Sequence, residues 1–361
     1  MIIIVVYCLT VAHVRSKECA PVQDKPTSII CSNPEHIMTN LTYYLSNFST
    51  MTELSLVHSY LTEMPPIDNT HEPFVVLRLD HNQIQLFNRN YSSLESLHLS
   101  SNHIYSLHQT NLYYPNLKYL DLSHNPIEHI IENFFADEQF PRLQVLKLTN
   151  ALSNVNPYLI ENRFLSFASM SHLQEIDLDE NDLEDFSCTS NATHIRWQLP
   201  ASIRKISFGK NKLATLDAAC FSATVNLTEL DVHYNFLRAL SNPNGYFSNL
   251  SKLQLAYNLF TNIPSTFLTS LPRLTELDLS ANQFNVEELK SAKRSPFPSS
   301  LTSLSLNSMN SDLTCGMFEN LRELEQLQLA HLGATQLKSC LWKKLISLKT
   351  VRLPVDRTRR H

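Results

Sequence analysis

Apolar residues recur along most of the chain in one fixed pattern, L-x-x-L-x-L-x-x-N-x-L, which returns every 20 to 30 residues. A clear copy is Leu250-Leu253-Leu255-Asn258-Phe260. Counting the first residue of a copy as position 0, apolar residues at positions 3 and 5 alternate with polar ones, and this period of two predicts a β-strand with one buried face. Clean copies begin at residues 74, 94, 117, 173, 203, 227, 250 and 274, and degenerate copies at 51, 143, 301, 324 and 348.

The regular spacing of the copies predicts how the strands are arranged. Successive copies stack as parallel strands and bury one continuous leucine core, which implies a single domain. Thirteen strands about 4.8 Å apart span an inner arc of roughly 60 Å, which is large enough to hold a protein. The asparagine at position 8 turns the chain out of the strand, and its amide is expected to bond backbone groups of the turn. Aromatic residues before the next copy are expected to fill the other side of the core: Phe48, Tyr91, Tyr114, Phe140, Phe167, Phe221, Phe318 and Trp342.

The copies carry a known signature. The stretch NLFTNIPSTFLTSLPRLTELDL at 258–279 resembles the repeats of Toll-like receptors, Slit-type proteins and matrix proteoglycans, and residues 51–353 as a whole resemble the extracellular leucine-rich repeat family. The resemblance implies an α/β solenoid, a horseshoe with a parallel β-sheet on its concave face and about 13 repeats. It also implies that residues 17–50 form an N-terminal cap. The four-cysteine C-terminal cap of the family is missing, and residues 354–361 are a basic tail.

The beginning of the chain and its sequons indicate the secretory route. Residues 2–12 are an apolar run that is too short to span a membrane, so residues 1–16 are interpreted as a signal peptide, with a buried N-terminal strand as the alternative. No later stretch is long and apolar enough for a membrane anchor. The chain is therefore expected to be secreted or to lie on the extracellular face of the plasma membrane. Six glycosylation sequons agree with this: Asn40, Asn47, Asn90, Asn191, Asn226 and Asn249.

Removal of the leader would leave six cysteines, an even number that favours pairing in an oxidising compartment. Cys19 and Cys31 lie together before the first repeat and are expected to pair. Adjacent repeats superpose, so cysteines at similar positions one repeat apart lie near each other. The pairs Cys188 with Cys220 and Cys315 with Cys340 follow from this, with small core residues as the alternative.

The composition argues against several other functions. The four glycines are scattered, which excludes glycine-rich dinucleotide and phosphate loops. His98, His103 and His108 recur every five residues, but they occupy different sides of one repeat and cannot converge on a metal. No basic stripe suits nucleic acid, although residues 335–361 hold eight Lys and Arg against one acid. We therefore expect no cofactor, no metal, no nucleic-acid partner and no enzymatic activity.

The outward positions 2, 4 and 6 predict the binding surface. In the copies beginning at 173, 227 and 274 these positions carry seven carboxylates: Glu175, Asp177, Asp179, Glu229, Asp231, Glu276 and Asp278. Like charges on neighbouring strands repel and are expected to add nothing to folding, so the patch is interpreted as a docking site for a basic partner. The alternative interpretation is a solvated face that keeps the sheet from pairing with another.

These observations predict an extracellular binding protein that recognises a protein or glycoprotein partner on its concave face, in adhesion or receptor-type recognition. Two alternatives remain open. One is the ectodomain of a Toll-like pattern-recognition receptor, and the other is a structural matrix protein.

Overall fold

The computed structural model of the chain describes residues 2–5, 20–22, 25–30, 51–67, 74–155, 164–188, 196–242, 244–262, 264–284, 295–308, 314–330 and 342–353. The chain forms two compact units, where the repeat pattern predicts one continuous domain. Unit 1 comprises residues 1–181 and 190–202, and unit 2 comprises residues 182–189 and 203–361.

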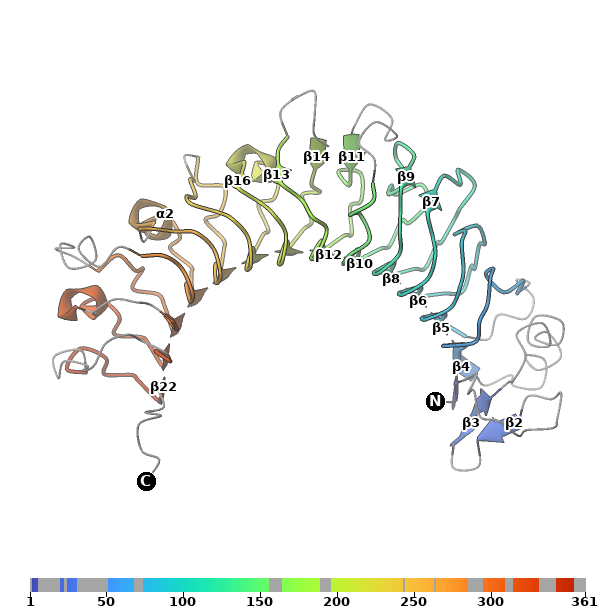
Figure 1. Ribbon diagram of the computed structural model, residues 1–361, viewed down its shortest axis with the longest axis horizontal. Helices are drawn as coiled ribbons and strands as arrows, with labels where there is room; N and C mark the ends of the chain where they lie inside the picture. Colours follow the sequence, from blue (N-terminus) through green and yellow to red (C-terminus); the bar gives the residue numbers. More distant parts are fainter. Residues whose placement is uncertain are drawn as a thin grey trace. The chain divides into compact units, whose positions relative to one another are not determined.

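Unit 1 is built on a sheet of short parallel strands, each provided by one turn of the chain (Figure 1). The central residues of these strands are aligned across the sheet, from Leu54 through Leu77 and Leu97 to Ile176, and they are buried. The strands, in order, are β1 (Ile2–Val5), β4 (Met51–Ser55), β5 (Val76–Arg78), β6 (Ser96–His98), β8 (Tyr119–Asp121), β10 (Val145–Lys147) and β12 (Glu175–Asp177).

Unit 2 repeats this arrangement. Its central residues run in register from Ile206 through Leu230, Leu253 and Leu277 to Val351. The strands are β15 (Lys205–Ser207), β17 (Glu229–Asp231), β18 (Lys252–Gln254), β19 (Glu276–Asp278), β20 (Ser303–Ser305), β21 (Gln326–Gln328) and β22 (Thr350–Arg352). Among the described residues, each of the thirteen predicted strand positions therefore carries a strand, and the chain is a parallel-strand solenoid.

The loop side of the turns has little regular structure. Pairs of short strands, each two or three residues long, lie there, opposite the main strands (Figure 1). They are β7 (Ser106–Leu107) with β9 (His129–Ile130), β11 (Phe164–Ser166) with β14 (Arg196–Gln198), and β13 (Asp185–Phe186) with β16 (Thr215–Leu216). Short helices follow in unit 2: η2 (Ala218–Phe221), α2 (Ser265–Thr269) and η3 (Cys315–Phe318). Tyr91, Tyr114, Phe140, Phe167, Phe221 and Phe318 are buried, as predicted, whereas Trp342 is half-buried and Phe48 lies outside the described residues.

The N-terminal segment contains two further elements. Strand β1 lies within the apolar run interpreted as a signal peptide, and it pairs in parallel with β4. The alternative interpretation of this run is an N-terminal strand, and the pairing agrees with that alternative. Strands β2 (Ala20–Val22) and β3 (Lys25–Ile30) form an antiparallel hairpin in the expected cap, with Ala20 opposite Ile30. Cys19 and Cys31 are each one residue beyond this pair in the sequence and lie outside the described residues. The signal peptide and the cap disulfide therefore stay predictions.

The asparagine at position 8 is buried, and it links each turn to its neighbour as well as closing its own. Asn258 is typical: its Oδ1 accepts the Leu237 N–H at 3.0 Å, and its Nδ2 donates to the carbonyls of Val232 at 2.9 Å and Leu255 at 3.2 Å. The same pattern recurs at Asn102, Asn125, Asn235 and Asn282. The expected bonding to backbone is confirmed, and it forms a ladder along each unit.

The residue at position 7 of each described turn, directly before the asparagine where there is one, has left-handed backbone, a conformation that favours glycine. These positions hold His58, His81, Ser101, His124, Asn150, Glu180, Lys210, Tyr234, Tyr257, Ala281 and Ser308, with φ between 47° and 59°. His58, Asn150 and Ser308 are followed by Ser59, Ala151 and Met309. In the other eight turns the asparagine ladder holds the turn, and no glycine is used.

Candidate functional site

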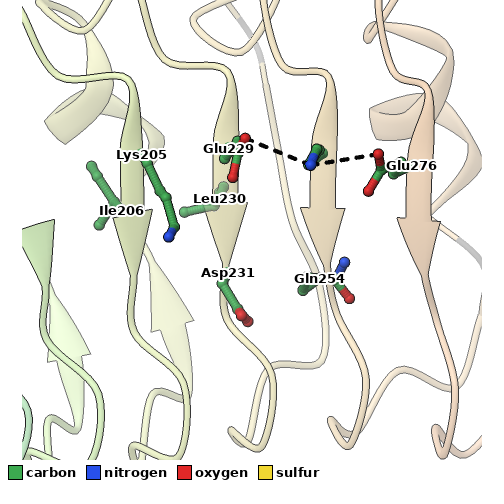
Figure 2. Close-up of a pocket in the computed structure, with 8 residues that line it drawn as sticks. Lys205, Ile206, Glu229, Leu230, Asp231, Gln254 and Glu276 are labelled. Atoms are coloured by element: carbon green, nitrogen blue, oxygen red, sulfur yellow. Dashed lines mark ion pairs between the residues drawn. The ribbon is translucent and has the colours of Figure 1, made fainter. Parts of the chain in front are cut away.

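The outward side chains of the parallel strands form a surface that we call the strand face. In β17, β18 and β19 the central leucine is buried while the residues on either side of it are half-exposed. Figure 2 shows Lys205, Glu229, Asp231 and Glu276 projecting on this side of unit 2. Each side chain is placed by the backbone register, so the face is defined by the repeat frame.

The carboxylates of unit 2 alternate with lysines. Lys252 on β18 stands between β17 and β19, and its Nζ lies 3.8 Å from Glu229 Oε1 and 3.5 Å from Glu276 Oε1 (Figure 2). Lys205 on β15 is in register with Glu229 on the other side. The expectation that like charges repel on neighbouring strands is therefore wrong here, because a lysine-bearing strand separates the two acidic ones.

The aspartates at position 4 close the ends of their strands. Asp278 Oδ1 accepts the Ser280 N–H at 2.8 Å, and Asp231 Oδ1 accepts the His233 N–H at 3.0 Å. The Asp231 carboxylate also lies 2.7 Å from His233 Nδ1. These bonds satisfy backbone donors where the strand turns outward. The expectation that the carboxylates add nothing to folding is wrong for these residues.

The three acidic residues of the copy beginning at 173 lie in unit 1. Lys147 on β10 forms ion pairs with Glu175 and, at 3.5 Å, with Asp177 on the adjacent strand. Burial opposes the charge of Lys147, but its hydrogen bond to Glu175 and the nearby carboxylate of Asp177 raise its pKa overall. Asp177 Oδ1 also accepts the Asp179 N–H at 3.1 Å, which repeats the strand-end bond of unit 2.

A second cluster on the strand face of unit 1 includes Arg78, His98 and Tyr119. Arg78 Nε lies 2.6 Å from Glu53 Oε1, and its Nη1 lies 3.3 Å from His98 Nδ1. Arginine can only donate, so Nδ1 accepts and the ring proton is on Nε2. Burial and then the charge of Arg78 lower the pKa of His98, which keeps the ring neutral. The ring of Tyr119 lies 4.8 Å from that of His98 between centroids, and burial followed by Asp121 raises the pKa of Tyr119 to about 12.

The predicted binding surface includes neither the lysines nor this cluster, because it was defined by carboxylates alone. Lys205 and Lys252 occupy position 2 and Lys147 position 4, the same outward positions that identified the carboxylates. Including both signs of charge at positions 2 and 4 would have predicted the alternation.

The histidines do not form a metal site in the described part of the chain. No group of three or more metal-binding side chains occurs there. His98 contacts Ser96 Oγ at 2.9 Å, while His108 contacts Ser106 Oγ at 2.8 Å on the loop side. Within the same described residues, no helix is long and apolar enough to cross a membrane.

Comparisons with known proteins agree with the repeat pattern. A family model described as leucine rich repeat matches residues 92–152. Osteomodulin of Rattus norvegicus is 30% identical over 141 residues, which cover 32% of this chain and 31% of that protein. CD180 antigen of Mus musculus is 38% identical over 120 residues, covering 33% of this chain and 17% of that protein. The chain thus spans at most about a third of these curated relatives.

Solved structures show the same architecture. The octameric complex of latrophilin 3, Unc5D and FLRT2, whose FLRT2 part is a leucine-rich repeat, contains a chain with a TM-score of 0.59 at 21% identity, over 81% of this chain and 87% of that one. The leucine-rich repeat domain of APL1B has a TM-score of 0.56 at 20% identity, over 87% and 86%. The fold is a leucine-rich repeat solenoid.

One disulfide in the leucine-rich repeats joins adjacent turns of unit 2. Cys188 and Cys220 are bonded, with their Cα atoms 5.3 Å apart, as their similar repeat positions predict. Cys315 is also disulfide-bonded, while Cys340, its expected partner, lies outside the described residues. Similar positions in neighbouring repeats therefore predicted the disulfide between Cys188 and Cys220 correctly.

Three of the six sequons lie on described leucine-rich repeats. Asn90 and Asn226 are exposed, and Asn249 is half-buried. The Nδ2 of Asn90 donates to the carbonyl of Asn111 at 3.0 Å, and that of Asn249 donates to the carbonyl of Val225 at 2.6 Å. Asn40, Asn47 and Asn191 lie outside the described residues. Asn226 and Asn249 directly precede repeats whose strands form the strand face of unit 2, so glycans there would border that face.

Proposed function

We propose that this chain is a non-enzymatic extracellular binding protein that holds a protein partner on the strand face of its repeats. The observation that supports this most is the row of outward side chains that the strand register and cross-strand ion pairs hold in place. Lys252 between Glu229 and Glu276 is the clearest example. Because these side chains are already ordered, little conformational entropy is lost when a partner binds.

The comparisons support a binding role. In the FLRT2 complex, a chain of the same fold takes part in a multiprotein assembly. Partial matches to osteomodulin and CD180 antigen favour the outside of the cell, in agreement with the sequons. On the strand face of unit 2 the four carboxylates outnumber the two lysines beside them, Lys205 and Lys252, so we propose that the partner surface is basic and that the charges steer its approach.

The test is a screen of secreted and cell-surface ectodomains against the secreted full chain, followed by matched variants. Glu229→Gln with Glu276→Gln removes two strand-face charges without touching the strand-end aspartates. Glu319→Gln with Glu323→Gln removes two exposed charges elsewhere in unit 2 and serves as the control. We expect the first pair to weaken binding at least about fivefold and to reduce its salt dependence, and the control to do neither.

Two results would contradict the proposal. The first is that no ectodomain binds at micromolar concentration. The second is that the strand-face variant and the control bind a confirmed partner equally well with the same dependence on salt.

A further inference from the structure

Three exposed aromatic residues gather at the strand ends of unit 2. Tyr234 is 46% exposed, Phe236 51% and Tyr257 47%, although the other large aromatic residues of this unit's turns are mostly in the core. The rings of Tyr234 and Tyr257 stack with centroids 3.9 Å apart and planes only 8° from parallel. A stacked pair held in solvent presents a flat, ordered aromatic surface.

The two tyrosines occupy the same position in consecutive turns, and backbone hydrogen bonds link these positions from turn to turn. Both occupy position 7 in left-handed backbone, with φ of 50° and 56°. The Tyr234 N–H donates to the Ala256 carbonyl, the Tyr257 N–H to the Ser280 carbonyl, and the Ala281 N–H to the Asn307 carbonyl. Each turn thus holds its position 7 against the next turn, about one strand spacing away. Ala281 is the position-7 residue of the turn that follows Tyr257.

In unit 2 the stacked rings at position 7 stop at Tyr257. The next position 7 holds Ala281, whose side chain is only a methyl group, and Tyr257 is 47% exposed. We call the space above Ala281, on the face of Tyr257 away from Tyr234, the gap. Among the described residues, Tyr234 is the one ring that stacks on Tyr257. The spacing between neighbouring turns leaves room above the Ala281 methyl group for one planar group to continue the stack.

The charge beside this gap is negative. Asp278, in the same turn as Ala281, directs its Oδ1 to the N–H of Ser280, the residue directly before Ala281. It forms no ion pair within the described part of the chain, in contrast to Glu276 on the same strand. On the other side of the stacked pair, the turn before Tyr234 carries Lys210 at position 7, so this chain itself places a positive charge there. A planar cation therefore suits the open end in both shape and charge.

We infer that the outer face of Tyr257 above Ala281 receives an arginine side chain of the partner protein, with Asp278 accepting a hydrogen bond from its guanidinium. Guanidinium is planar, stacks on aromatic faces and is weakly hydrated, whereas the ammonium group of lysine is compact and strongly hydrated. This inference rests on the proposed function and adds the chemical group that the partner presents.

The test uses capped Gly-Arg-Gly as the probe and capped Gly-Lys-Gly as its match. In the secreted full chain carrying ¹³C-methyl alanine, we expect the arginine peptide to shift the Ala281 methyl signal saturably. Surface plasmon resonance then gives the affinities. We expect Tyr257→Leu to raise the dissociation constant of the arginine peptide about two- to fivefold, which is the ratio that corresponds to the loss of one exposed cation–π contact. Asp278→Asn keeps an acceptor for Ser280 and is expected to weaken binding similarly.

Ala281→Tyr is the decisive variant because it fills the gap with a ring of the chain itself, in a backbone position that already accepts tyrosine twice. We expect it to fold normally and to abolish binding of the arginine peptide. Tyr105→Leu, at an exposed tyrosine of unit 1, is the control and should leave the affinity unchanged.

The inference is overturned if the Ala281 signal does not move, if the lysine peptide binds as tightly as the arginine peptide, or if Ala281→Tyr still binds. A shift caused by a neutral N-acetylglucosamine disaccharide and not by arginine would assign the gap to carbohydrate instead. If a protein partner depends on Glu229 and Glu276 but is unaffected by Ala281→Tyr, the proposed function stands and this inference fails.

Discussion

Replacing Asn258 tests whether the asparagine ladder holds the turns together. The side chain is 3% exposed, and its Oδ1 accepts the Leu237 N–H while its Nδ2 faces the carbonyls of Val232 and Leu255. Asn258→Ala leaves the Leu237 N–H buried without a partner, which costs about 1–3 kcal/mol, and removes bonds to the carbonyls worth about 1 kcal/mol each. We expect a loss of about 2–5 kcal/mol in the free energy of unfolding, independent of pH.

Asn258→Asp is the sharper variant because it changes only the donor. Its second carboxylate oxygen would face carbonyl oxygens, so the folded state favours the protonated acid and the pKa of the new group rises above its unfolded value of about 3.9. A raised folded pKa destabilises the fold above the unfolded pKa, and the penalty disappears as the pH falls. Between pH 7.0 and 4.5 the penalty can shrink by up to about 3 kcal/mol, since each pH unit is worth about 1.36 kcal/mol.

The assay is urea denaturation followed by circular dichroism at both pH values, with each variant compared with the parent at the same pH so that other titrating groups cancel. Asn244→Asp is the control, because Asn244 is exposed and, among the described residues, its side chain bonds only the Tyr246 hydroxyl, which can also donate to a carboxylate. A penalty for Asn258→Asp that is the same at pH 4.5 and pH 7.0, or one no larger than that of the control, would refute the ladder argument.

Two further predictions concern the covalent features. Replacing Cys188 and Cys220 together by Ser opens a link between residues 32 apart and should lower the free energy of unfolding by about 3–4 kcal/mol in the chain-entropy model, measured by the same urea titration; an unchanged midpoint would contradict it. Chain secreted from eukaryotic cells should lose apparent mass on treatment with an N-glycosidase, with sugar mapped to the exposed Asn90 and Asn226, and an unaltered mass would count against the secretory route.

The repeat frame could be predicted because its signal is local and repeated. Burial of Leu253 and Leu255 is set by alternation within one strand, and their neighbours in the next turn follow the same rule. A single copy would be ambiguous, but thirteen copies in one register fix both the strand positions and their parallel order. The disulfide between Cys188 and Cys220 followed from the same frame, because it depends only on position within the repeat.

Side-chain partners across strands were harder to predict, since they depend on which residue occupies the facing position of the next turn. Lys252 pairs with both Glu229 and Glu276, so one residue on the intervening strand decides whether these two glutamates have a partner. The left-handed turn had no signal at all in the sequence. Tyr234 and Tyr257 occupy it without glycine because the following asparagines bond the backbone of two turns at once.

The outward carboxylates of unit 2 therefore fall into two classes with different expected roles. Asp231 and Asp278 bond the backbone where their strands end, so replacing them disturbs the turn as well as any partner. Among the described residues, the only ion pairs of Glu229 and Glu276 are those with Lys252, and exposed ion pairs of this kind contribute about 0–1 kcal/mol to folding. Charges that add little to stability can be changed with little effect on the fold. The position-2 glutamates are thus where selection for a partner could act most freely, and where substitution separates binding from folding most cleanly.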